Sequence, residues 1–210
     1  MTPLVPPIAL HLVGAGRGAE AFARLAGTLG WPVTVLDHRP ALLASLALDA
    51  NVTAQPVHGV HGVAEALADL ACDARVAVAL LSHRFDVDAA WLAATLPRPF
   101  GYIGVLGSRT RGGELVAHVE ATVANGGIAF DRRWLGKLHA PIGLDLGGED
   151  PASIALAAVA EIEAVMHGRP GGSLRERQSP IHARTPTPRL LDRPPSAPPL
   201  APLRCDLPPD

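Results

Sequence analysis

The sequence has very little lysine and tyrosine, and these shortages exclude two common classes of nucleotide-dependent enzyme. Lys137 is the only lysine among 18 basic residues, and leucine follows it, so no P-loop Gly-Lys-Ser/Thr signature is present. Tyr102 is the only tyrosine, and it does not begin a Tyr-x-x-x-Lys motif. Two cysteines, Cys72 and Cys205, form neither a Cys-x-x-Cys motif nor a zinc-binding spacing. This cysteine usage favours a reducing cytoplasm.

Long apolar runs and a strong net charge are also lacking. The first 16 residues are apolar but carry no basic segment, and glycines interrupt them, so we expect neither a signal peptide nor a membrane span. A net charge of −2 and a pI near 6.5 give no reason to expect nucleic acid or a membrane surface as a partner. His58 and His61 have roughly a metal-ligand spacing, but no third ligand is near, so no metal site is predicted.

What is present is typical of an α/β protein, because short apolar runs alternate with longer helical ones. Strands are expected at 8–13, 31–37, 53–57, 75–82, 100–107 and 137–143, and helices at 19–29, 40–48, 63–70, 87–96, 111–124 and 151–167. Repeated βα units predict a Rossmann-like, doubly wound, mostly parallel sheet over residues 1–168. Residues 169–210 hold 11 of the 21 prolines and lose the apolar periodicity, which predicts a mostly disordered tail.

A glycine cluster follows the first expected strand and reads G-x-G-x-x-A. Gly14 suits the tight turn, and Gly16 allows a pyrophosphate to approach the backbone. Arg17 and Gly18 complete the candidate phosphate site, because free N–H groups at a helix N-terminus attract anions. Alternatively, the turn has no ligand or binds another anion.

The second expected strand ends at Asp37, close to the spacing of a carboxylate that binds a ribose hydroxyl. Arg39 follows two residues later, and an arginine at this place can instead hold a 2′-phosphate. The sequence leaves both nucleotide types open.

Later strands of the predicted sheet also end in polar residues, which face the ligand crevice in such folds. His83 is a candidate general acid or base that Asp86 would orient; the alternative is a loop histidine beside a helix-capping aspartate. Gly107, Ser108 and Arg109 form a second candidate anion cradle, with a plain helix start as the alternative.

The last βα connection contains two further candidates. His139, on the expected strand 137–143, and Asp145, in the following loop, would line the same crevice. His139 is a second candidate catalytic residue, and Asp145 a candidate binding residue. A buried histidine and a turn aspartate are the alternative.

These segments together resemble the xanthine dehydrogenase accessory protein family (XdhC/CoxI), in its C-terminal Rossmann-like domain, over roughly residues 8–168. The segments are HLVGAGRGAEAFARLAGTLGWPVTVLDHRP, LLSHRFDVD, GYIGVLGSRTR and LHAPIGLDLGGEDPASIALAAVAEI. The resemblance implies binding of the molybdenum cofactor, its protection during sulfuration, and its delivery to a xanthine-dehydrogenase-type apoenzyme. It also places His83, Gly107, Ser108, Arg109, His139 and Asp145 at the crevice.

The sequence departs from the family pattern in two ways. Family members usually carry an N-terminal domain with a cysteine-containing, glycine-rich segment, whereas this chain starts at the Rossmann strand, so we expect a partner to supply that domain. Gly18-Ala19 stands where the family more often ends its turn in glycine.

The sequence therefore favours a non-catalytic accessory protein that handles the molybdenum cofactor through a nucleotide-binding domain. Its expected cofactors are NAD(P) or another nucleotide and, by resemblance, the molybdenum cofactor. Its expected partners are a molybdenum hydroxylase apoenzyme or a separate cysteine-containing accessory domain, and a homodimer is left open. A small NAD(P)-dependent oxidoreductase and a degenerate module without catalysis remain as alternatives.

Overall fold

The computed structural model describes residues 6–47, 49–127 and 129–178, in which six parallel strands form one sheet. The strands are β1 (Ala9–Val13), β2 (Val33–Asp37), β3 (Val52–Pro56), β4 (Val76–Leu80), β5 (Tyr102–Val105) and β6 (Leu138–His139). Their order is β3-β2-β1-β4-β5-β6, and every neighbouring pair is parallel. This is the strand order of dinucleotide-binding sheets, which reverses between β1 and β4. The predicted Rossmann-like fold class is confirmed.

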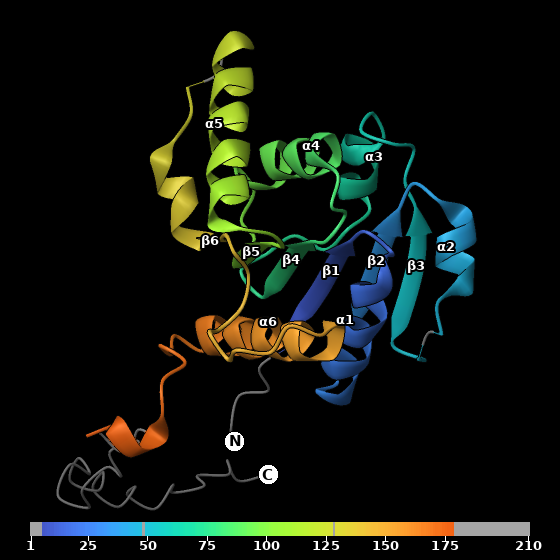
Figure 1. The fold of residues 1–210 in the computed structure, drawn as a ribbon. Coiled ribbons are helices and arrows are strands. Elements are labelled where there is room, and N and C mark those ends of the chain that lie inside the picture. The colour runs from blue at the N-terminus through green and yellow to red at the C-terminus, as the bar shows by residue number, and fades with distance from the viewer. Residues whose placement is uncertain (1–5, 48, 128, 179–210) are drawn as a thin grey trace, which may run out of the picture. The chain divides into compact units, whose positions relative to one another are not determined.

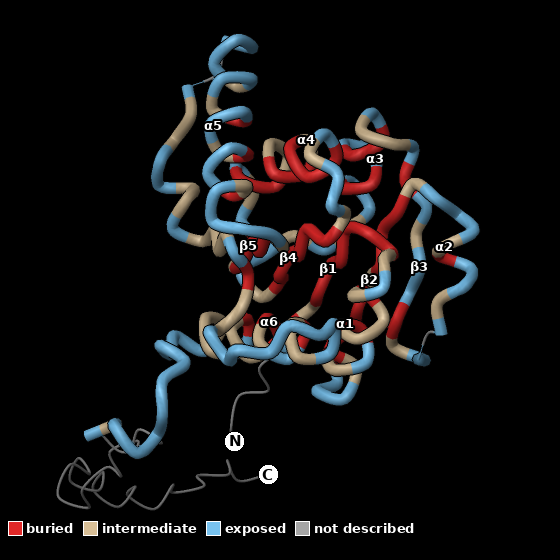
Figure 2. Tube along the Cα trace, in the orientation of Figure 1, coloured by how far each residue is buried: buried red, intermediate tan, exposed pale blue. Residues whose placement is uncertain are grey.

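Helices cover both faces of this sheet (Figure 1). They are α1 (Arg17–Thr28), α2 (Pro40–Ser45), α3 (Val63–Ala68), α4 (Phe85–Thr95), α5 (Arg109–Asn125) and α6 (Pro151–Met166), with the 3-10 turns η1 (Arg132–Lys137) and η2 (Leu174–Glu176). One apolar cluster joins α1 and α6 to one face of the sheet, and a second joins α3, α4 and α5 to the other. The buried central strands lie between these two layers (Figure 2).

The sequence accounts for where these elements lie and where they begin. All five residues of β4 are buried because both of its faces are covered, which is why its sequence, VAVAL, is uniformly apolar. Asp150 begins α6, with its carboxylate accepting from the N–H groups of Ala152 and Ser153. Ser108 begins α5 in the same way, through the N–H of Arg111.

The last expected strand is much shorter than predicted. We expected residues 137–143, but β6 spans only Leu138–His139, preceded by η1, which the periodicity did not indicate. Pro141 has no N–H to donate to a strand ladder, so regular pairing with β5 cannot continue through it. Gly104 and His139 form the last residue pair in register between the two strands.

The chain divides into two units at Gly171 and Gly172, and the first contains the whole sheet. The second contains η2; most of the predicted tail, residues 179–210, lies outside the described residues. None of the described helices is long and apolar enough to cross a bilayer.

Candidate functional site

The loops after β1 and β4 meet at the point where the strand order reverses. Gly14 has a φ of +112°, and a Cβ built on it would lie 2.8 Å from the backbone N and Cα of Ser82. Its N–H donates to the carbonyl of Leu36, while the N–H of Leu81 donates to the carbonyl of Val13, both at 2.7 Å. Gly14 is therefore needed for the close approach of two neighbouring loops as well as for the turn itself.

The N-terminus of α1 has free donors beside this contact. Gly16 is the N-cap and provides no side-chain acceptor, and Ala19 is the first residue whose N–H donates back, to the carbonyl of Gly16. Within the described part of the chain, the N–H groups of Gly16, Arg17 and Gly18 have no hydrogen-bond partner, and the exposed Arg17 has no ion pair. A Cβ at Gly16 or Gly18 would meet nothing within 4 Å, so the side-chain positions beside these unpaired amides are open.

Asp37, at the end of β2, is buried and already fully hydrogen-bonded. Its Oδ2 accepts from the N–H of Ala15 at 2.7 Å and from Nη2 of Arg39 at 2.8 Å. Its Oδ1 accepts from the N–H and Nε of Arg39, both at 2.9 Å. Burial would raise the pKa of this carboxyl, but the hydrogen bonds from Arg39 and Ala15 outweigh it and lower the pKa to about 2. Asp37 thus joins the glycine turn to β2 as a permanent anion.

A polar bridge extends from this carboxylate to the loop after β4. His38 Nδ1 lies 3.3 Å from Asp37 Oδ1, and His38 Nε2 lies 3.2 Å from Nη1 of Arg84. Arg84 is held in turn by Asp86, with Nη2–Oδ2 at 2.5 Å and Nε–Oδ1 at 3.2 Å. A guanidinium can only donate, so His38 Nε2 accepts and its Nδ1 carries the proton.

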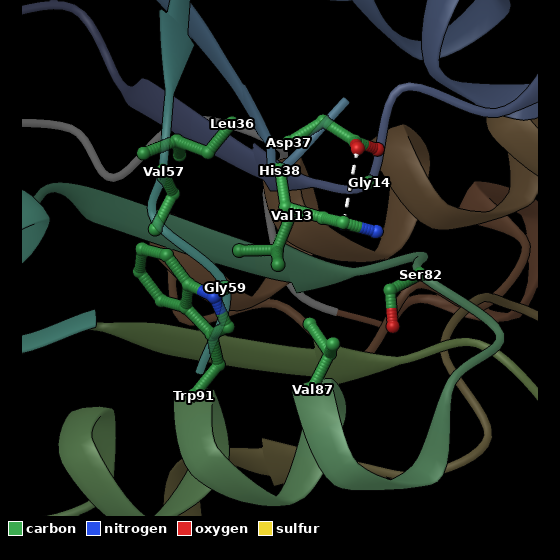
Figure 3. A pocket seen from close by; sticks show the side chains of 10 residues that line it. All are labelled: Val13, Gly14, Leu36, Asp37, His38, Val57, Gly59, Ser82, Val87 and Trp91. Carbon is green, nitrogen blue, oxygen red and sulfur yellow. Dashed lines mark ion pairs between the residues drawn. The ribbon is translucent and has the colours of Figure 1, made fainter. Parts of the chain in front are cut away.

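A small pocket lies beside Asp37 and His38 (Figure 3). Its lining comes from the ends of β1, β2 and β4, from α4 and from the segment after β3: Val13, Gly14, Leu36, Asp37, His38, Val57, Gly59, Ser82, Val87 and Trp91. The cavity volume is about 20 Å³, which is enough for about one water molecule. The buried indole of Trp91 forms part of its floor, so a base or sugar has no room inside this arrangement.

The second predicted anion cradle lies at the start of α5. Gly107 has a φ of +143°, Ser108 caps the helix, and the exposed side chain of Arg109 has no partner among the described residues. The neighbouring Arg111 is used structurally, because it donates at 2.7 Å to Asp88, whose side chain is fully buried.

Asp88 also connects this cradle to the crevice. Its Oδ1 accepts from Ser82 Oγ at 2.5 Å, while its Oδ2 accepts from Arg111. The loops after β4 and β5 are thereby tied together through one buried carboxylate. Sequence reasoning missed this role of Asp88.

His83 follows Ser82 at the carboxyl end of β4 and is exposed. It has a φ of +58°, the only positive φ among non-glycine residues in the described ranges. We expected Asp86 to orient the imidazole of His83, but Asp86 is paired with Arg84 instead. Asp86 forms its salt bridge with a residue only two positions away. A sequence motif does not show whether Arg84 or His83 is its partner.

The other predicted candidates lie apart from the glycine turn. His139 stacks on Tyr102 with ring centroids 4.4 Å apart, and its Nδ1 lies 3.3 Å from Oε1 of Glu161, in the α6 layer. Asp145 is exposed and lines a separate hollow of about 260 Å³ formed by residues 142–149 and α6.

Glu161 was not singled out from the sequence, although it organises this region. Its Oε2 accepts from the hydroxyl of Tyr102 and, at 2.8 Å, from the N–H of Gly143. Burial and the hydrogen bond to Glu161 raise the pKa of Tyr102 well above its ordinary value. The only indication of this role in the sequence is that Glu161 stands among the apolar residues of α6.

No group of three or more potential metal ligands occurs in the described ranges, which include His58 and His61. Cys72 precedes β4, at the opposite edge of the sheet from the glycine turn, and Cys205 lies outside the described residues.

The sequence matches the family model described as the XdhC Rossmann domain over residues 10–162. The chain belongs to the XdhC Rossmann domain family. That match begins in β1 and ends within α6, so it covers the sheet and the loops that form the crevice. The recognition made from the sequence segments is confirmed.

Two curated relatives and one solved structure are similar to this XdhC-family chain. "Uncharacterized protein YqeB" of Escherichia coli is 30% identical over 172 residues, covering 81% of this chain and 30% of that protein. A probable xanthine dehydrogenase subunit of Bacillus subtilis is 28% identical over 160 residues, covering 75% and 42%. A xanthine dehydrogenase from Bacillus halodurans has the same fold, with a TM-score of 0.62 at 23% identity, covering 78% and 44%. The chain spans less than half the length of each.

Proposed function

We propose that this chain is a nucleotide-binding accessory domain for xanthine-dehydrogenase-type molybdoenzymes. In this role it binds the nucleotide or phosphate part of a cofactor, either NAD(P) or the molybdenum cofactor in a nucleotide form. A molybdenum hydroxylase apoenzyme or a separate cysteine-containing accessory domain acts as its partner. The proposal joins the family membership to the crevice geometry, since each alone is compatible with other activities.

One observation carries the binding part of the proposal. The N–H groups of Gly16, Arg17 and Gly18 lie at the start of α1, beside the switch point of the sheet, and have no partners in the described chain, while Cβ positions at Gly16 and Gly18 are open. A pyrophosphate accepts hydrogen bonds from such amides, and the helix dipole stabilises an anion there by about 0.3–1 kcal/mol. Arg17 adds a flexible positive charge beside them.

The family resemblance associates the molybdenum end of the cofactor with a cysteine-containing segment. No cysteine lies at the carboxyl edge of the sheet in the described ranges, since Cys72 is at the other edge. The residues present therefore fit the phosphate groups of a dinucleotide form, and the metal-bearing end of the cofactor is left to a partner domain.

The oxidoreductase alternative assigns the general acid or base to His83 or His139. His83 lacks an orienting carboxylate in the described part of the chain, because Asp86 is engaged by Arg84. His139 has Glu161 as a partner, but it lies apart from the unpaired amides of the glycine turn, which favours binding over catalysis there.

Calorimetric titration tests the proposal with NAD, NADP, CTP and a molybdopterin cytosine dinucleotide. Saturable binding is expected for at least one of them, and Gly16→Asp abolishes it by placing a carboxylate where the phosphate sits. Gly16 has an ordinary φ of −72° and no neighbour near a Cβ, so this variant folds normally.

Gly136→Asp is the matched control, because Gly136 in η1 also has open space around a Cβ and the change adds the same charge far from the turn. The affinity of this control for nucleotide is expected to equal that of the unchanged protein. Absence of binding to all four ligands by folded protein would refute the proposal, as would equal binding by Gly16→Asp.

A further inference from the structure

Basic side chains from two strand ends contact Asp37 and His38, which line the small pocket. His38 and Arg39 follow β2, and Arg84 follows β4, so they come from opposite sides of the glycine turn after β1. The side chains of Arg39 and Arg84 are 45% and 51% exposed, which leaves their outer donors accessible. Each guanidinium is oriented by a two-point carboxylate contact, to Asp37 and Asp86 respectively.

Asp37 cannot act as a ribose acceptor in this arrangement. A carboxylate offers about four lone-pair sites, and the N–H of Ala15 with three donors of Arg39 already fills them. A ribose 2′-hydroxyl would have to displace Arg39 from a short, forked and charge-assisted contact. In related folds a carboxylate at the position of Asp37 binds the free ribose diol. Here Arg39 occupies the acceptor atoms of that carboxylate.

The hydrogen bond between His38 and Arg84 is weaker than the contacts that Arg39 and Arg84 make with carboxylates. It joins a charged donor to a neutral ring nitrogen at 3.2 Å. A phosphate oxygen is a stronger acceptor for Arg84 than this nitrogen, because it carries the charge opposite to that of the guanidinium, whereas the ring nitrogen is neutral. Replacing His38 by an incoming phosphate at Arg84 is therefore favourable in free energy, whereas replacing it by an uncharged hydroxyl is not.

We propose that His38, Arg39 and Arg84 bind a phosphate carried on the ribose of an adenine nucleotide, so that the crevice takes NADP-type ligands in preference to NAD-type ones. The inference rests on the proposed nucleotide-binding function and adds the class of nucleotide. The pyrophosphate lies on the amides of Gly16 and Gly18, and the ribose phosphate lies between the ends of β2 and β4.

Calorimetric titration of the full chain with NADP and NAD, and with adenosine 2′-monophosphate and 5′-monophosphate, tests this. The 2′-phosphorylated member of each pair is expected to bind at least about tenfold more tightly. Arg84→Ala is expected to weaken the binding of NADP and of adenosine 2′-monophosphate more than that of NAD, so the preference falls.

Arg24→Ala is the matched control, because Arg24 is an exposed arginine of α1 whose partner is Glu20. It keeps the full preference for NADP. Arg39→Ala frees Asp37, so its preference is expected to invert toward NAD, a change that a merely structural role of Arg39 would not produce.

Three outcomes overturn the inference. Equal or tighter binding of NAD by the unchanged protein does so while leaving the proposed function intact. Binding of CTP or a molybdopterin dinucleotide, but of neither adenine dinucleotide, has the same meaning. Absence of any nucleotide binding removes both the inference and the proposed function.

Discussion

Two carboxylates, the buried Asp37 and the half-buried Glu161, organise different parts of the sheet, and they differ in what surrounds them. Asp37 lies at the end of β2 beside the glycine turn, with Arg39, His38 and Arg84 on its solvent side. Glu161 lies on α6 against β5 and β6, with the hydroxyl of Tyr102 and the N–H of Gly143 as its donors.

Asp37 and Glu161 differ in whether the hydrogen-bond donors near them remain available to a ligand. Around Glu161 the donors come from a buried tyrosine and the backbone, and each is used within the protein. Around Asp37 the partners are half-exposed cations, and unpaired amides of α1 lie next to them. A closed carboxylate cluster stabilises the fold, whereas one bordered by free donors has capacity for a ligand.

The largest effect is expected from Glu161→Ala, which breaks the closed cluster. It leaves the buried hydroxyl of Tyr102 and the N–H of Gly143 without an acceptor, at about 3 kcal/mol of unfolding free energy. Urea denaturation measures this loss, while nucleotide affinity is expected to stay unchanged.

A double-mutant cycle with Tyr102→Phe identifies the cause. In the phenylalanine background Glu161→Ala costs less, because the orphaned hydroxyl is no longer there. Equal costs in both backgrounds would show that Glu161 does not act through Tyr102.

A pH effect of intermediate size is expected at Asp37. Its folded pKa of about 2 lies below the ordinary value of 3.8, so its contribution of about 2 kcal/mol is fully present above pH 3.8 and lost as the pH falls through about 2. Urea denaturation at several pH values between these limits measures the slope.

Asp37→Asn isolates this contribution from other carboxylates. Side-chain hydrogen bonds from Arg84, Arg133 and Ser153 also lower the pKa of Asp86, Asp131 and Asp150, so the unchanged protein contains their effects as well. The slope is expected to be smaller in Asp37→Asn. Identical slopes in the two proteins would contradict the assigned role of Arg39 and Ala15 as its stabilising donors.

The sequence was sufficient to predict the sheet, the order of its elements and the glycine turn. These depend on local patterns: apolar runs for buried parallel strands, cap residues such as Ser108 and Asp150 for helix starts, and glycine where the backbone turns. Gly14 was predictable as a turn residue, but its contact with Ser82 depends on which strands become neighbours.

The polar networks could not be predicted, because they join residues far apart along the chain. Arg84 meets His38 across 46 positions, Arg111 meets Asp88 across 23, and Tyr102 meets Glu161 across 59. No spacing rule covers such distances. The pairs Arg39–Asp37 and Arg84–Asp86 are local, two residues apart, but the sequence alone does not select them over other partners.

His139→Ala is expected to have the smallest effect. It tests whether the cluster around Glu161 is separate from the ligand site beside Asp37. The change removes a stack on Tyr102 and a contact with Glu161 from a partly exposed ring, so it costs about 1 kcal/mol in urea denaturation. Because the histidine belongs to the closed cluster, nucleotide affinity stays unchanged in the calorimetric titration. A loss of affinity as large as that of Gly16→Asp would place His139 at the ligand, and the two clusters would then be parts of one site.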